Sequence, residues 1–128
     1  MRALLDTHSL LWFLDGDERL SAPAREIIED GQNDVLASIA TLWEIAIKHS
    51  VGKLDLGRPF SELFPAELEA TAISVLDLEV AHLSKVVALP FHHRDPFDRL
   101  MIVQAMVEQI PIVGNDPQFD AYGITRLW

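Results

Sequence analysis

The sequence predicts an α/β fold of three layers, with a central parallel sheet of four to five strands between two layers of helices. Short apolar runs, each the length of one buried strand, alternate with longer segments whose apolar residues recur at helical spacing. Strands separated by helices favour right-handed crossovers, which make neighbouring strands parallel and place helices on both faces of the sheet. No repeat, low-complexity tract or linker interrupts the 128 residues, so we expect one domain over residues 1–128.

The first half of the chain predicts two strands and three helices. A glycine-containing turn ends the first helix, and a serine followed closely by a proline begins the second. In the third helix the apolar residues share one face, while Thr41, Glu44 and Lys48 form the opposite polar stripe. Glu44 and Lys48 are also spaced for an ion pair one helical turn apart. The expected strands are Ala3–Leu5 and Val35–Ala37, and the expected helices are Thr7–Leu14, Ser21–Gly31 and a third from Ile39 to a stop at Gly52.

The second half predicts three more strands, and prolines and glycines again separate the elements. The expected strands are Ile73–Leu76, Pro111–Val113 and Ile124–Leu127. The expected helices are Pro59–Ala70 with a break at Pro65, Glu79–Leu89, Pro96–Glu108 and a short helix after Pro117.

Composition restricts the partners of the protein. Twenty acidic and ten basic side chains give a net charge of −10, the wrong sign for binding nucleic acid through a general basic surface. Apolar residues make up 49% of the chain and the mean hydropathy is +0.16, so we expect part of the apolar surface to contact another chain. The absence of cysteine excludes disulfides, thiolate metal sites and a cysteine nucleophile. An early charge argues against a secretory signal, and the run Leu100–Val107 is too short for a membrane span, so we expect a cytoplasmic protein.

Four acidic residues, Asp6, Glu44, Asp98 and Asp116, lie where a predicted strand has just ended or a predicted helix has just begun. Each alone has a structural interpretation, as a helix cap, as a first-turn acid, or, for Glu44, as part of a capping box with Thr41. Together they indicate more, because the carboxyl ends of parallel strands converge on one crevice. Carboxylates are the ligands that Mg²⁺ and Mn²⁺ require. We therefore expect the four acids to meet there and to bind one or two of these ions.

Four segments carry these acids, in the order LLDTHSLLWFL, ASIATLWEIAIKHSVGKL, HRDPFDRLMIVQA and IVGNDPQFDAYGI. The set resembles the PIN-domain ribonucleases, and among them the VapC-type toxins of bacterial and archaeal toxin–antitoxin pairs. The resemblance covers nearly the whole chain and implies a PIN fold in which Asp6, Glu44, Asp98 and Asp116 bind Mg²⁺ or Mn²⁺. It also implies an RNA substrate, a homodimer, and a cognate antitoxin protein that fills the active-site groove.

The same resemblance implies roles for three further residues. Thr7 and Ser38 would be hydroxyls that position water or support the ligands, and Arg99 would contact either the substrate or the protein itself. One segment departs from the family pattern, since Gly114 and Asn115 precede Asp116 where many relatives have threonine or serine. This departure affects only the role that the threonine or serine hydroxyl of those relatives would have at this place.

Phosphodiester hydrolysis suits this set of residues. Water attacks the phosphorus in line, and negative charge builds on the attacking and leaving oxygens. One cation can lower the pKa of water, and a second about 4 Å away can stabilise the leaving oxygen, so no side-chain base is required. We expect Asp6 and Asp98 to be the principal ligands, with Glu44 close by. Asp116 is expected either to lie in the outer shell of the ion or to bind a second ion.

Other candidate residues have structural interpretations. The histidines lack the spacing of a zinc motif, and His92 and His93 are expected to be solvated or to cap a helix. Asp95 is expected to cap the helix that Pro96 begins. No Gly-x-Ser-x-Gly elbow or glycine-rich phosphate loop is present. Five aromatic residues are expected in the core or at a partner contact, namely Trp12, Phe13, Trp43, Phe97 and Phe119.

Two other functions stay open on the sequence alone. A receiver-like or phosphohydrolase α/β domain also gathers acids and Mg²⁺ at strand ends. Against it, no lysine follows Lys85, and His8 stands where the second acid of an Asp-x-Asp signature belongs. The other alternative is a catalytically silent interaction module whose acids only cap helices.

Overall fold

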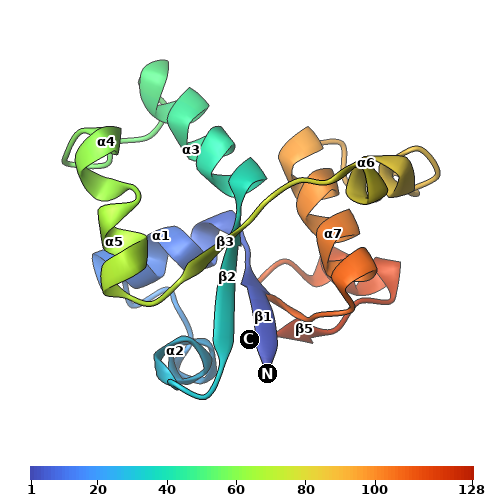
Figure 1. The fold of residues 1–128 in the computed structure, drawn as a ribbon, viewed down its shortest axis with the longest axis horizontal. Coiled ribbons are helices and arrows are strands. Elements are labelled where there is room, and N and C mark those ends of the chain that lie inside the picture. The colour runs from blue at the N-terminus through green and yellow to red at the C-terminus, as the bar shows by residue number, and fades with distance from the viewer.

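A five-stranded sheet forms the centre of the computed structural model, which describes residues 1–128. All pairings are parallel and the strand order is β3-β2-β1-β4-β5. Helices lie on both sides of the sheet (Figure 1). The predicted three-layer α/β fold with a parallel sheet of four to five strands is therefore confirmed. The strands are β1 (Arg2–Leu5), β2 (Asp34–Ser38), β3 (Ser74–Leu76), β4 (Ile112–Val113) and β5 (Arg126–Leu127).

Every predicted helix is present, with small differences at the ends. The expected helix over residues 79–89 covers only Val80–Val86, and the one over residues 59–70 is divided at Pro65 as expected. The helices are α1 (Thr7–Asp15), α2 (Ala22–Glu29), α3 (Ile39–Ser50), α4 (Phe60–Leu63), α5 (Ala66–Ala70), α6 (Val80–Val86), α7 (Pro96–Glu108) and the 3₁₀ helix η1 (Pro117–Tyr122). None of these helices combines the length and apolar character needed to cross a bilayer.

The sheet buries both of its faces, because successive strand residues point to opposite sides. In β1, Ala3 and Leu5 belong to one apolar cluster, which includes residues of α1, α2 and α5. Leu4 belongs to a second cluster, with residues of α7 and with Phe119 of η1. This two-sided burial explains why the strands are continuously apolar in the sequence rather than alternating.

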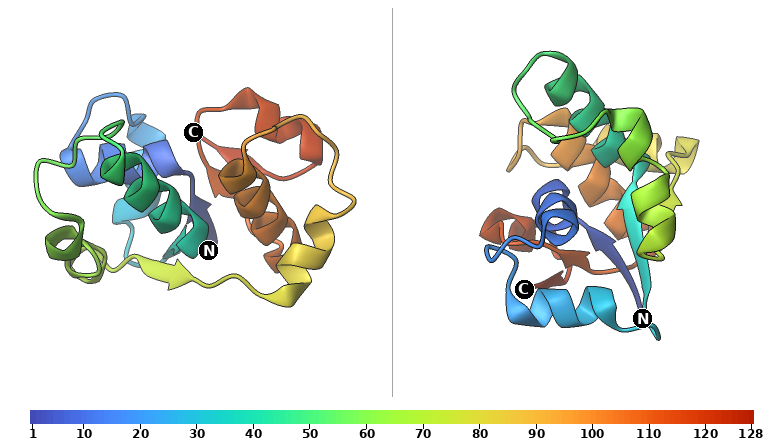
Figure 2. Two further views of the ribbon diagram at one scale, coloured as in Figure 1. Left: turned by 90° about the horizontal axis from the view of Figure 1, so that it is seen from above. Right: turned by 90° about the vertical axis from the view of Figure 1, so that its left-hand side faces the viewer.

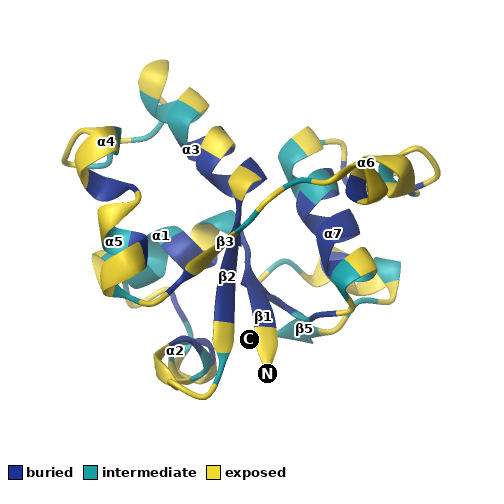
Figure 3. Cartoon of the chain, viewed as in Figure 1, coloured by how far each residue is buried: buried dark blue, intermediate teal, exposed yellow.

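Helix α3 exposes much of its apolar stripe and buries part of its polar one. Trp43 is 55% exposed, which excludes the core position that was one of its two expected settings. By contrast, Thr41 and Glu44 are buried, and buried and exposed bands alternate along α3 in Figure 3. α3 follows directly from β2 and contacts α7, as the view from above shows (Figure 2, left). Thr41 and Glu44 of the polar stripe are thus enclosed near the carboxyl end of the sheet, while the Lys48 side chain is 45% exposed.

Candidate functional site

Asp6 lies between the end of β1 and the start of α1. Its backbone N–H donates to the carbonyl of Val113 in β4 at 3.0 Å, and its Oδ1 accepts the N–H of Ser9 at 2.7 Å, which caps α1. The residue is only 7% exposed. Burial raises the pKa of Asp6, the Ser9 N–H bond opposes that shift, and the negative charge of Asp116 adds to it.

Glu44 is buried in the second turn of α3 and has a partner on each carboxylate oxygen. Thr7 donates its hydroxyl to Oε1 at 2.6 Å, and the Lys48 ammonium contacts Oε2 at 2.7 Å. The predicted ion pair with Lys48 is confirmed. The predicted capping box of Thr41 and Glu44 is wrong, because α3 begins one turn earlier and Ser38 is its N-cap. Glu44 therefore does not cap α3, and its carboxylate is held by side chains from two helices.

Asp98 lies in the first turn of α7, next to the cap of that helix. Asp95 accepts the backbone N–H groups of Phe97 and Asp98 at 2.8 and 3.1 Å, which confirms its predicted capping role. Burial, together with the negative charges of Asp95 and Glu44, raises the pKa of Asp98 from 3.8 to about 6. The raised pKa means that the ionised form of Asp98 is destabilised by its surroundings. A cation that neutralises the neighbouring negative charges stabilises that ionised form.

Asp116 caps η1 and contacts a histidine from another part of the chain. Its Oδ1 accepts the N–H of Gln118 at 2.9 Å, and its Oδ2 lies 2.7 Å from Nε2 of His93. The charge of Asp116 acts on both Asp6 and Asp98, whose pKa values it helps to raise. Asp116 is therefore electrostatically part of the same cluster.

A pocket of about 290 Å³, the carboxylate pocket, brings three of the four predicted acids together. Asp6, Glu44 and Asp98 line it together with Asp95, while Asp116 is not among its lining residues. No three acidic or imidazole side chains lie close enough together to hold a metal ion as they stand. The donor set nevertheless consists of the hard carboxylate oxygens that Mg²⁺ and Mn²⁺ prefer. The residues thus fit a divalent cation by chemistry and by their shared pocket.

The model of the PIN domain family matches residues 3–124 of this chain. The chain belongs to the PIN domain family. Ribonuclease VapC16 of Mycobacterium tuberculosis (strain ATCC 25618 / H37Rv) is 37% identical over 68 residues, which are 50% of this chain and 48% of that protein. The matched region thus spans about half the length of this relative. This match confirms the resemblance that the four acid-bearing segments indicated.

Two solved structures share the fold of this PIN domain. A chain in the crystal structure of VapBC2 from Rickettsia felis, bound to a DNA fragment from their promoter, has a TM-score of 0.73 and 15% identity. That similarity covers 98% of this chain and 97% of the other. A chain of FitAB bound to the IR36 DNA fragment has a TM-score of 0.59 and 18% identity, covering 97% and 92%. At these identities the comparison establishes a common architecture.

Ser38 supports this PIN domain from behind the carboxylate pocket and does not line it. Its hydroxyl is fully buried, accepts the N–H of Ala40 at 3.0 Å and donates to the side-chain oxygen of Gln104. The amide of Gln104 in turn donates to the carbonyl of Asp77 at 3.2 Å. Ser38 thus joins α3 to α7 and the segment after β3. Thr7, by contrast, contacts Glu44 directly within the pocket.

Arg99 is buried and contacts the protein itself. Its guanidinium donates to the carbonyls of Leu89, Pro90 and His93 at 3.0, 2.9 and 3.2 Å. It also lies over the ring of Phe91, 3.9 Å from the centroid. Of its two expected roles, the structure favours the structural contact, because all of these partners belong to the loop before α7.

His93 is a site residue that the sequence interpretation missed. It is 7% exposed rather than solvated, and it contacts Asp116 instead of capping a helix. The two residues are 23 positions apart in the sequence, in segments that only the folded chain brings together. The neighbouring His92 is exposed, as expected. No local pattern separates the two histidines, so nothing in the sequence could have identified His93.

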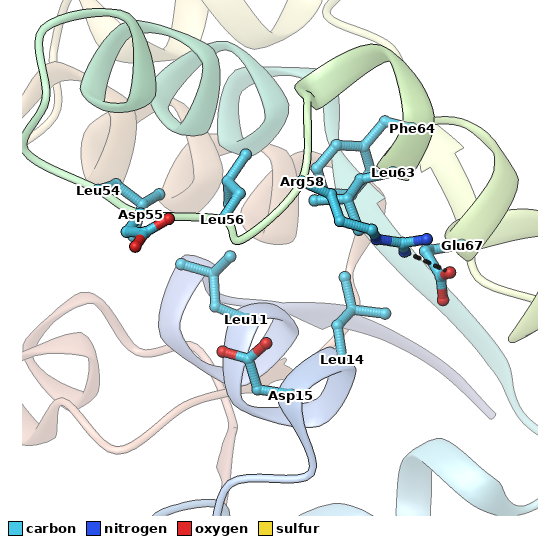
Figure 4. Close-up of a pocket in the computed structure, with 10 residues that line it drawn as sticks. All are labelled: Leu11, Leu14, Asp15, Leu54, Asp55, Leu56, Arg58, Leu63, Phe64 and Glu67. Carbon is cyan, nitrogen blue, oxygen red and sulfur yellow. Dashed lines mark hydrogen bonds and ion pairs between the residues drawn. The ribbon is translucent and has the colours of Figure 1, made fainter.

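A second cavity, the leucine pocket, lies between α1 and the segment leading into α4 and α5, and five leucines and four charged residues are among its lining residues (Figure 4). It measures about 220 Å³ and shares Leu11 and Leu54 with the carboxylate pocket, so the two cavities adjoin. Leu14 and Leu63 face each other across it, and the ion pair of Arg58 with Glu67 at 2.7 Å lies on its rim. Six of its ten lining residues are apolar and four are charged, so the PIN domain offers a mixed surface next to its acidic pocket.

Proposed function

We propose that this PIN domain is a metal-dependent ribonuclease and the toxin of a toxin–antitoxin pair. The observation that carries the proposal is the shared pocket of Asp6, Glu44 and Asp98 at the carboxyl end of the parallel sheet. Ligand sites in open α/β sheets lie at this end. The similarity to Ribonuclease VapC16 supports RNA as the polymer that is cut.

The cofactor in this proposal is Mg²⁺ or Mn²⁺, as one or two ions. Asp6 and Asp98 would be its principal ligands, with Glu44 beside them and Asp116 further out or on a second ion. The raised pKa values of Asp6 and Asp98 support this, because a cation stabilises the ionised carboxylates and so offsets the desolvation and repulsion that raise those values. When bound, the cation supplies positive charge for the developing negative charge on the phosphate and Lewis acidity for the attacking water.

The residues around the carboxylates hold them in place for this reaction. The Ser9 N–H fixes one oxygen of Asp6, and Thr7 fixes one oxygen of Glu44. Such restraint limits the reorganisation that binding requires. Lys48 and Lys53 line the same pocket and bring positive charge toward a phosphodiester, which counters the overall charge of −10.

An RNA cleavage assay tests the proposal. We expect a labelled, unstructured RNA to be cut in the presence of Mg²⁺ or Mn²⁺, leaving a 5′-phosphate, and Asp6→Asn to abolish the cut. Asp34→Asn is the matched control, because Asp34 is an exposed aspartate at the opposite end of β2. Equal cleavage by the parent and Asp6→Asn, or none by a folded parent, would contradict the proposal and favour the catalytically silent module.

The proposed antitoxin would cover both adjoining cavities. The apolar side chains of the leucine pocket fit the apolar face of a partner helix, and the carboxylate pocket fits a basic side chain of the same partner. The similarity of fold to VapBC2 and FitAB supports a partner of this kind. We expect the parent protein to co-purify with the product of a neighbouring reading frame. We expect Leu14→Glu to lose that complex. We expect the protein to act in the cytoplasm, where its proposed RNA substrate and antitoxin would be found.

We also propose a homodimer, with the exposed stripe of α3 as the contact. Ile39, Trp43 and Ile47 are spaced one helical turn apart and are 38%, 55% and 39% exposed. Helix α1 is less suited to this contact, because its Leu10 is buried and four further apolar residues of α1 pack against the core. Light scattering should give twice the mass of the 14.4 kDa chain for the parent and the monomer mass for Trp43→Glu. A monomeric parent at high concentration would remove this part of the proposal.

A further inference from the structure

We propose that His93 is a positioning residue for the nuclease site, which orients the carboxylate of Asp116 and is itself oriented by Tyr122. The proposal rests on the proposed function, in which Asp116 belongs to the metal-binding set. Nε2 of His93 lies 2.7 Å from Oδ2 of Asp116, and Nδ1 lies 3.0 Å from the Tyr122 hydroxyl. The three side chains thus form a continuous hydrogen-bonded chain that ends at a site carboxylate.

The hydrogen bonds determine which nitrogen of His93 carries the proton. The backbone N–H of His93 donates to the Tyr122 oxygen at 2.8 Å, so the phenol proton is free to donate to Nδ1. A carboxylate oxygen only accepts, so Nε2 must be the donor toward Asp116. Tyr122 therefore selects the Nε2–H tautomer, which is the one that binds Asp116. An outer partner that fixes the tautomer of a histidine in this way also fixes its direction.

Packing holds the imidazole ring of His93 against rotation. The ring stacks on Phe119 at a centroid distance of 5.1 Å and on Tyr122 at 5.5 Å. Its backbone carbonyl accepts a hydrogen bond from the buried Arg99 at 3.2 Å. His93 thus presents Nε2–H from a rigid position in the loop before α7, where its ring packs against Phe119 and Tyr122 of η1.

Asp116 needs such a partner, because little else restrains its side chain. The side chain is 36% exposed, and its other oxygen is held only by the backbone N–H of Gln118 at 2.9 Å. With one donor on each oxygen, the plane of the carboxylate is fixed while lone pairs are left for a ligand. Asp116 is thereby oriented without being buried, in contrast to Asp6.

Two substitutions of His93 separate positioning from a general structural role. The side-chain amide nitrogen of glutamine can take the place of Nε2. The asparagine side chain is one methylene group shorter, so its amide nitrogen matches the position of Nδ1 and does not reach Asp116. We expect His93→Asn to weaken binding of Mn²⁺ alone and RNA cleavage by roughly 10-fold to 100-fold, the usual effect of losing an outer-shell partner. His93→Gln should restore both close to the parental values. His92→Gln is the control, since His92 is exposed, makes no hydrogen bond to Asp116 and touches Tyr122 only edge-on through its ring, at a centroid distance of 5.0 Å.

The measurements are Mn²⁺ affinity by calorimetry, cleavage kinetics, and thermal unfolding of each variant. A long-range ¹H–¹⁵N correlation spectrum of the parent should show His93 with a protonated Nε2 and an unprotonated Nδ1, and Tyr122→Phe should change that pattern. If the parent binds Mn²⁺ and cleaves RNA but His93→Asn matches it in both, the positioning role is refuted. Equal losses in His93→Gln and His93→Asn refute it as well. A folded parent that neither binds Mn²⁺ nor cleaves RNA overturns the proposed function itself.

Discussion

Gly114 leaves the space that the carboxylate of Asp6 occupies beside the end of β4. A Cβ atom at position 114 would lie 2.7 Å from Oδ2 and 3.0 Å from Cγ of Asp6, and 3.3 Å from the ring of Phe119. Asp6 cannot easily turn away, because its other oxygen accepts the Ser9 N–H at 2.7 Å. The glycine that departs from the family resemblance thus allows a close approach of backbone to carboxylate.

Gly114→Ala should displace Asp6 and impair the site while the fold is retained. A shift of a reacting group by about 1 Å typically costs on the order of 100-fold in rate, and we expect a loss of this size in RNA cleavage. Gly31→Ala is the matched control, because nothing lies within 4 Å of a Cβ at that position and its φ is not in the left-handed region. Cleavage kinetics and Mn²⁺ calorimetry check the prediction. If Gly114→Ala cleaves RNA at the parental rate, the prediction is wrong, because Asp6 can then shift without loss of activity.

Asp98→Asn should stabilise the metal-free protein at neutral pH while abolishing cleavage. Burial and neighbouring acids raise the pKa of Asp98 to about 6 in the folded protein, against 3.8 ordinarily. The folded state therefore holds more protons than the unfolded state between these pH values, and stability falls as pH rises from about 4 to about 6. Asparagine carries no charge, so the variant does not lose stability through this ionisation. Thermal unfolding with a chelator at pH 5 and 7.5 tests this, and a lower melting temperature for Asp98→Asn than for the parent at pH 7.5 would contradict it.

The start of α7 is an example of structure that the local sequence determines. Asp95 followed by Pro96 predicts an N-cap and a first helical turn, and the observed α7 begins at Pro96 and ends at Glu108 as predicted. The short apolar runs of the strands are equally local, and all five strands form where they were expected. Their pairing in one parallel sheet follows from the alternation with helices.

The orientation of α3 and the setting of His93 could not be predicted in the same way. A polar stripe such as Thr41 and Glu44 normally faces solvent, but here Glu44 is buried, has partners for both oxygens and lines the same pocket as Asp98. Trp43 is exposed as a consequence. These placements depend on contacts between segments far apart in the sequence, which periodicity does not encode.

Mn²⁺ should stabilise the protein more at pH 7.5 than at pH 5. Below about 6, the pKa of Asp98, the carboxyl group is protonated, and a cation must displace that proton to bind. A ligand that binds only the folded state raises the melting temperature in proportion to its free-energy contribution. Thermal unfolding with and without Mn²⁺ at both pH values measures the effect, with Asp98→Asn as the variant that lacks this proton. An equal increase in melting temperature at both pH values in the parent would contradict the prediction.

Thr7→Val should weaken the site through Glu44. The substitution keeps the shape of the side chain but removes the hydroxyl that donates to Oε1 of Glu44 at 2.6 Å, leaving that oxygen without a hydrogen-bond donor. Loss of a partner that orients a ligand carboxylate costs roughly 10-fold to 100-fold in metal affinity or activity, and we expect an effect in this range on both Mn²⁺ binding and RNA cleavage. Thr125→Val makes the same chemical change at an exposed position and should leave both unaltered. Thermal unfolding distinguishes the effect from misfolding, because Glu44 keeps its ion pair with Lys48 in the variant. Unchanged Mn²⁺ affinity in a folded Thr7→Val would show that the Lys48 contact alone is sufficient to place this carboxylate.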